Sequence, residues 1–225
     1  MKNSRNRLSI GKQIATIMVV ISVFGGISQE NSTQNTPPTH QKYSVSMPLI
    51  ILPQLATKSW NDRTHTQHFE FHIKRNLDQK NIVGLKFATW RLFQPMGITW
   101  WDGLLDKIET KSEFYPGHLR EIGLGISYQR MIYKGLFATV EVLPQFKTYL
   151  DENKIKVGNG FKLYNSFHIG YHFDFGKKKQ FFLQPQVHSQ FWVFDTNTPA
   201  AFNQLDQKWR NYFLLEPNLY FGIKF

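Results

Sequence analysis

The last thirteen residues of the chain alternate between apolar and polar side chains with a period of two. One face holds Phe213, Leu215, Pro217, Leu219, Phe221, Ile223 and Phe225, and the other holds Leu214, Glu216, Asn218, Tyr220, Gly222 and Lys224. Successive side chains of a β-strand point to opposite faces, whereas those of an α-helix repeat every 3.6 residues. The pattern therefore predicts a β-strand over residues 213–225, longer than the average strand of about five or six residues.

The same alternation recurs upstream and divides most of the chain into strands. We expect them at residues 43–54, 67–75, 82–93, 119–131, 136–149, 161–175 and 181–194. The first is the weakest, because Pro48 and Pro53 lie within it and proline is confined to the edges and bulges of sheets. A seven-strand count, or a first strand displaced by several residues, stays open.

Short and long connections alternate between these strands. The short ones cover residues 76–80, 132–134 and 176–179, and the long ones cover 55–66, 94–118, 150–160 and 195–212. Short turns at one end and long loops at the other are expected of a membrane-spanning barrel. The fold class predicted for residues 43–225 is therefore all-β, a closed antiparallel up-and-down transmembrane β-barrel of about eight strands. Within the longest loop, residues 100–108 are expected to form a short helix at the barrel rim.

Alternation alone does not say which face of the barrel wall points outward. The polar faces carry Gly123, Gly125, Gly170 and Gly222, and glycines relieve crowding in the narrow interior of an eight-strand barrel. The apolar faces hold almost no charge over nine or more residues, which matches a tilted membrane-spanning strand. We therefore expect the apolar faces to contact lipid. A soluble exported barrel that binds an apolar ligand inside is the alternative.

Aromatic side chains gather near both ends of the proposed strands. Tyr171, Phe173, Phe175 and Phe181 mark one end, and Trp192, Phe194, Trp209 and Phe213 mark the other. Transmembrane barrels carry such girdles at their two membrane interfaces. We expect both groups to face outward.

The N-terminal 28 residues have the layout of a secretory signal peptide. A basic segment, residues 1–12, precedes twelve apolar residues at 13–24, and Gly26 and Ser28 supply small residues before a cleavage site. The apolar stretch is shorter than the roughly 20 residues of a membrane-spanning helix. An uncleaved N-terminal anchor stays the alternative. Residues 29–42 are polar, contain a proline pair and are expected to form a flexible lead-in.

The amino-acid composition of the chain excludes several classes of function. The chain has no cysteine, which excludes disulfides, thiolate metal sites and a cysteine nucleophile. Its formal charge is +11, of which Lys2, Arg5, Arg7 and Lys12 account for four, and the remaining charge is spread along the chain. We expect no nucleic-acid partner, because no recognition motif accompanies the charge.

The chain ends on Tyr220, Phe221, Gly222, Ile223, Lys224 and Phe225. This segment resembles the C-terminal strand of small bacterial outer-membrane β-barrels, whose terminal Phe and alternating apolar residues are recognised during assembly. The resemblance implies a location in a Gram-negative outer membrane, with outer-membrane lipids and the barrel-assembly machinery as partners. Tyr220, Phe221, Ile223 and Phe225 would form the assembly signal.

Two groups of polar residues are expected inside the barrel. Glu141, His168, His188 and Glu216 lie at similar heights on four consecutive strands and would form one lumen cluster. Histidine with carboxylate suits a metal site or an acid–base site, but a satisfied polar core that fills a narrow barrel is the favoured interpretation. If the turn at residues 76–80 centres on Asp78, Glu70 lies directly opposite Lys86 as a lumen ion pair.

These features favour a non-enzymatic integral outer-membrane barrel that supports the envelope or binds a partner through its surface loops. We assign no catalytic residue, metal or cofactor. The alternative is a lipid-modifying enzyme such as a lipid A deacylase, a family similar in size and architecture that uses a His-x-Ser pair with a carboxylate. None of the eight histidines here is followed two residues later by serine.

Overall fold

The computed structural model describes residues 41–49, 67–98 and 114–225. The expected signal peptide at 1–28, residues 29–40 of the expected lead-in, residues 50–54 of the first expected strand and the helix expected at 100–108 lie outside the described residues. Those four expectations stay predictions.

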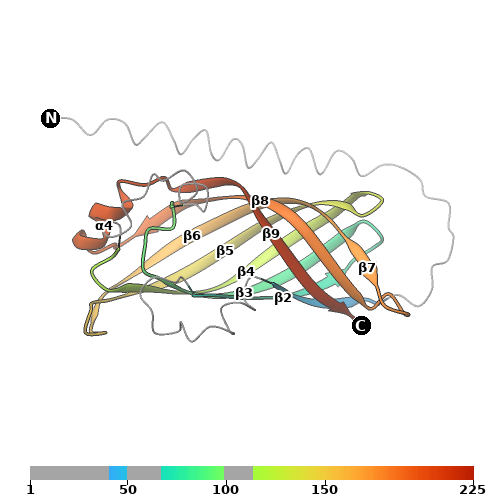
Figure 1. Ribbon diagram of the computed structural model, residues 1–225, viewed down its shortest axis with the longest axis horizontal. Helices are drawn as coiled ribbons and strands as arrows, with labels where there is room; N and C mark the ends of the chain where they lie inside the picture. The colour runs from blue at the N-terminus through green and yellow to red at the C-terminus, as the bar shows by residue number, and fades with distance from the viewer. Residues whose placement is uncertain (1–40, 50–66, 99–113) are drawn as a thin grey trace. The chain divides into compact units, whose positions relative to one another are not determined.

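The described residues form nine antiparallel strands. They are β1 (Tyr43–Pro48), β2 (Gln67–Asn76), β3 (Asn81–Leu92), β4 (His118–Tyr133), β5 (Leu136–Leu150), β6 (Lys156–Tyr171), β7 (Phe173–Phe175), β8 (Phe181–Thr196) and β9 (Tyr212–Lys224). Neighbours in sequence pair from β1 to β6, β6 then pairs with β8, and β9 joins β8 to β1. The short β7 continues β6 alongside β8. The result is a closed eight-strand barrel with one extra strand, which confirms the predicted β-barrel architecture (Figure 1).

The pairing of β1 with β9 closes the ring. The backbone N–H of Tyr43 donates to the carbonyl of Phe225 and the N–H of Phe225 donates to the carbonyl of Tyr43, each at 2.9 Å. Their rings stack with centroids 6.3 Å apart. A closed ring leaves no unpaired sheet edge, so the strand with the strongest alternation is also the one that completes the wall.

The connections sort to the two ends as the sequence predicts. Tight turns after β2, β4 and β7 lie at the end where the chain finishes, whereas α4 (Ala200–Asp206) lies at the opposite end (Figure 1). In the β4–β5 turn, Lys134 and Gly135 have φ of 42° and 96°, which suits a two-residue hairpin turn. No helix in the described ranges is long and apolar enough to cross a membrane.

The apolar faces of the strands point outward and the polar faces line the lumen. Leu124, Ile126 and Phe146 on the outer face are 63%, 64% and 67% exposed, whereas Glu121 and Gln145 on the inner face are 1% and 0% exposed. The predicted orientation of the wall is therefore confirmed. It is the reverse of what a barrel enclosing an apolar ligand with these faces would require.

Two members of the expected aromatic girdle at the α4 end instead face inward. A bulge in β9, where Leu215 has φ of 56°, shifts the pairing with β8 and leaves Phe213 only 7% exposed. Because a bulge adds one residue to a strand, it exchanges the two faces beyond it. A second irregularity, in the pairing of β6 with β8, accompanies a stack between Trp192 and Tyr164. The girdle prediction is therefore wrong for Phe213 and Trp192, while Phe194 stays 49% exposed.

Towards α4 the lumen holds an apolar core. Its buried members are Ala88, Trp90, Leu92, Tyr115, Leu119, Leu143, Tyr149, Tyr164 and Phe202. Phe202 is the buried residue of α4, and its ring lies 4.9 Å from those of Tyr115 and Tyr149. The helix is therefore anchored to this end of the barrel by one aromatic side chain.

Replacing Gly125 with alanine should destabilise the barrel by about 1–3 kcal/mol, because overpacking of a tight interior costs energy of that order. A Cβ atom on Gly125 would lie 2.4 Å from the carbonyl oxygen of Val142, which is backbone and has little freedom to move. The free energy of unfolding in urea, measured for the protein refolded in detergent micelles, checks this. Ile126→Val on the exposed outer face is the matched control. Equal stability of the two variants would contradict the packing argument.

Candidate functional site

The polar side chains inside the barrel form a network of contacts, and a buried lysine lies at its centre. Alternation along β3 places Lys86 inside, where its Nζ lies 2.9 Å from Glu141 Oε2 on β5 and 3.1 Å from Glu70 Oε2 on β2. All three side chains are largely buried. A desolvated charge is tolerated only when it is paired and hydrogen-bonded, so two carboxylates around one ammonium stabilise an otherwise costly group.

The pairing of Glu70 with Lys86 is confirmed, but their predicted register is wrong by two residues. Glu70 lies opposite Ala88, and Lys86 lies opposite His72. The β2–β3 turn is centred one residue later than predicted, because Asp78 Oδ1 accepts hydrogen bonds from the backbone N–H groups of Lys80 and Asn81. A two-residue shift keeps both side chains on the lumen face, and a lysine is long enough to span the diagonal.

The four residues predicted to cluster form a chain along the inner wall, over the adjacent strands β5, β6, β8 and β9. Glu141 Oε2 lies 3.3 Å from His168 Nε2, and the rings of His168 and His188 lie 5.2 Å apart. His188 Nε2 in turn lies 2.9 Å from Glu216 Oε2. Because Glu141 also contacts Lys86, the predicted cluster and the predicted ion pair are one network.

Sequence reasoning missed three members of this network. His72 lies with Nδ1 3.6 Å from Glu141 Oε1, and Ser166 Oγ lies 2.9 Å from His168 Nε2. The hydroxyl of Tyr220 donates to Glu70 Oε2 at 3.0 Å. The alternation places all three side chains on lumen faces. The sequence did not show that they lie at the same height along the barrel axis as the carboxylates.

The proposed assembly signal is divided between the two sides of the wall. Tyr220 is buried in the lumen, whereas Ile223 and Phe225 are 39% and 62% exposed and Phe221 is half-buried. The ring of Phe221 stacks with that of Phe181 on β8. Tyr220 therefore belongs to the interior network, and the other three residues belong to the outer face.

The network lacks the geometry of a catalytic triad. In a Ser-His-carboxylate relay the serine and the carboxylate contact different ring nitrogens. Here Ser166 Oγ and Glu141 Oε2 both lie next to Nε2 of His168, and Ser166 also donates to Glu141 at 3.2 Å. Within the described part of the chain, no group of three or more His, Asp or Glu side chains is arranged to hold a metal ion. The arrangement suits a polar core that fills a narrow barrel.

A second set of charges lies nearer to α4. Lys162 Nζ lies 2.5 Å from Glu121 Oε1, and Lys147 forms an ion pair with Asp195. Thr198 accepts from Lys147 at 3.2 Å and lies 3.0 Å from the hydroxyl of Tyr149. These contacts join β5 and the wall of the barrel to the segment that leads into α4.

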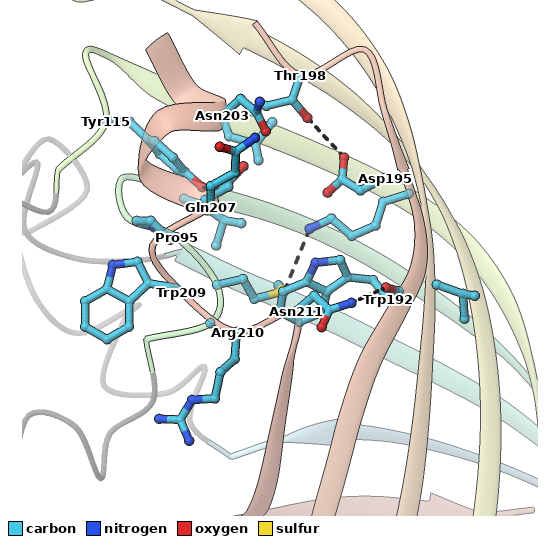
Figure 2. A pocket seen from close by; sticks show the side chains of 17 residues that line it. Pro95, Tyr115, Trp192, Asp195, Thr198, Asn203, Gln207, Trp209, Arg210 and Asn211 are labelled. Atoms are coloured by element: carbon cyan, nitrogen blue, oxygen red, sulfur yellow. Dashed lines mark hydrogen bonds between the residues drawn. The ribbon is translucent and has the colours of Figure 1, made fainter. Parts of the chain in front are cut away.

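Two cavities adjoin the charged side chains of the lumen. One of about 280 Å³ lies under α4, and Figure 2 shows Asn203 and Gln207 near Tyr115, with Asp195 and Trp192 on another side. The other, of about 400 Å³, lies in the lumen. Its lining includes Glu70, Lys86, Trp90, His188, Phe213, Glu216 and Tyr220, so it touches both predicted groups.

One hydrogen bond ties α4 to the connection between β3 and β4. The hydroxyl of Tyr115 donates to Asp206 Oδ1 at 2.5 Å. Burial raises the pKa of Asp206 above its ordinary value, and this effect outweighs the opposing effect of the hydrogen bond from Tyr115. Burial and the adjacent carboxylate likewise raise the pKa of the Tyr115 hydroxyl.

Comparison of the chain with protein-family models, with curated proteins and with solved structures found no match. The resemblance to outer-membrane barrels therefore stays a prediction from the C-terminal strand. The fold and the network above are the observations on which a function can be argued.

Replacing Glu141 with glutamine should cost about 3–5 kcal/mol of stability, because removing one partner of a buried ion pair leaves a charge uncompensated. Lys86 would keep only Glu70 as a carboxylate partner, and His168 would lose its charged neighbour. Urea unfolding in detergent micelles checks this, with Glu152→Gln at an exposed loop position as the control. A loss no larger than that of the control would contradict a central role for Glu141.

The docking of α4 should weaken as pH rises. A carboxyl whose folded-state pKa is raised adds stability that is complete below its unfolded pKa of about 3.9 and is lost as pH passes through the folded value. Hydrogen exchange of the α4 amides, compared between acidic and neutral pH, should therefore show faster opening at neutral pH. Asp206→Asn should abolish this dependence, and Asp151→Asn in the neighbouring loop should not. Identical pH profiles for all three proteins would refute the assignment.

Proposed function

We propose that the protein is an integral outer-membrane β-barrel with a non-enzymatic role, either supporting the envelope or binding a partner through its loops. The observation that carries the proposal is the polarity of the two faces of the barrel wall, which has apolar side chains outside and charged side chains inside. Large contiguous apolar surfaces on soluble monomers are rare and mark contacts with a membrane or a partner. Here the apolar surface surrounds the barrel, which suits lipid better than a single protein partner.

The strand lengths support a membrane-spanning wall. A bilayer core about 30 Å thick needs tilted strands of roughly 9–11 residues. The strands from β2 to β6 contain 10 to 16 residues. Aromatic side chains are exposed at the end with the short turns, among them Tyr43, Tyr133, Tyr171, Phe173, Phe175 and Phe225. Tyrosine and phenylalanine at such positions suit the boundary between hydrocarbon and headgroups.

The interior argues against transport through the lumen. Lys86 on β3 and His168 on β6 both contact Glu141 on β5, and these side chains occupy space that a pore would need. An eight-strand barrel has room for little more than its own side chains. A structural body with exposed loops therefore fits better than a channel.

Fractionation of the native host's envelope, followed by electrophoresis with and without boiling, tests the proposal. We expect the protein in the outer-membrane fraction, with a folded form that migrates differently from the boiled form because a closed barrel resists detergent. Recovery in a soluble fraction would overturn it. A membrane-bound protein without heat-modifiable migration would contradict an inserted barrel.

A further inference from the structure

The end of the barrel with the short turns carries an exposed ring of positive charge. It consists of Lys42, Arg75, Lys80, Lys134, Lys177, Lys178 and Lys179, which we call the basic crown. These residues come from the start of β1, the end of β2 and all three tight turns. The crown is therefore a property of the whole end of the barrel and not of one segment.

The acidic side chains at this end are already engaged. Asp78 accepts hydrogen bonds from backbone and side-chain groups of its own turn. Asp174 lies 2.5 Å from Lys224 and 2.8 Å from His172. Within the described residues neither carboxylate forms an ion pair with a crown side chain, and the crown side chains are exposed to solvent.

An aromatic residue lies within two positions of a crown residue at three places on the chain. Lys42 is followed by Tyr43, Tyr133 is followed by Lys134, and Phe175 is separated from Lys177 by one glycine. Tyr43, Tyr133 and Phe175 are all exposed on the outer face. Lys134 Nζ also lies 5.1 Å from the centre of the Tyr133 ring. A belt of exposed aromatic rings therefore lies just inside a belt of ammonium groups.

The opposite end differs in charge pattern. Its described residues mix Lys154, Lys156 and Lys208 with acidic residues such as Asp151 and Glu152. A general excess of lysine in the chain does not explain the basic crown, because the acidic side chains near it already form other hydrogen bonds or ion pairs.

We propose that the basic crown binds the anionic headgroups of phospholipids in the leaflet next to the short turns. This inference rests on the proposed membrane-spanning function, because the aromatic belt must lie at the interface for the crown to reach the phosphates. Clustered lysines beside a membrane-embedded segment attract anionic lipids, and long basic side chains reach from the apolar boundary to the headgroups. Lysine is a flexible point charge, which suits mobile lipids better than a ligand of fixed geometry.

The test is the lipid preference of the full chain reconstituted in phosphatidylcholine vesicles. Spin-labelled phosphatidylglycerol and phosphatidylcholine are compared for the fraction immobilised at the protein surface. We expect the anionic probe to be favoured about three-fold at low salt, with the preference falling as salt rises because screening weakens the attraction.

A matched pair of triple variants separates the crown from total charge. Lys177→Gln/Lys178→Gln/Lys179→Gln should clearly lower the preference, because it removes three of the seven crown charges, whereas Lys154→Gln/Lys156→Gln/Lys208→Gln at the opposite end should keep it. Both variants remove three charges from exposed positions, and each includes one lysine with positive φ, Lys179 at 52° and Lys154 at 63°. Urea unfolding of each confirms that the barrel still folds.

The outcomes distinguish this inference from the proposed function. If the wild type inserts as a heat-modifiable barrel but binds both probes equally, the crown proposal is overturned and the barrel stands. Equal losses in the two triple variants would also overturn it, since total charge would then explain the preference. Failure of the wild type to insert into vesicles overturns both.

Discussion

Lys86 shares its charge between Glu70 and Glu141, and the polar half of the lumen is arranged around that contact. A lone ammonium in this position would be too costly to bury, so the surrounding strands must supply carboxylates at one height. Glu141 then extends the network to His168, and His188 carries it to Glu216 on β9. Side chains thus join adjacent strands along the inner wall, and Lys86 on β3 reaches past β4 to Glu141 on β5, in addition to the backbone hydrogen bonds around the wall.

The lumen is divided along its length. Charged and amide groups fill the part around Lys86, whereas the part beneath α4 combines aromatic rings with the ion pairs of Lys147 and Lys162. The aromatic part receives Phe202 from α4 and Phe213 from the bulged region of β9. Both cavities adjoin this region.

The exterior has its own order along the barrel axis. Apolar side chains such as Leu124 and Ile126 cover the middle, aromatic rings follow towards the short turns, and the basic crown lies beyond them. Each layer matches a layer of a bilayer in polarity, from hydrocarbon to interface to phosphate. The proposed function and the proposed lipid preference are consequences of this one sequence of layers.

Alternation by itself determined the strands, their faces and the membership of most lumen residues, because a period of two assigns every side chain to one side of a sheet. It correctly brought Glu141, His168, His188 and Glu216 towards one another, since their heights could be counted from the turns. Only the tertiary structure decided the register of Glu70 and Lys86, which depends on how Asp78 binds the backbone of its turn. It also decided the inward positions of Phe213 and Trp192, because bulges change the phase of a strand without a clear mark in the sequence. The predicted ion pair and the predicted cluster form one network because Lys86 contacts Glu141. That contact depends on how β3, β4 and β5 pair, which the pattern of a single strand does not show.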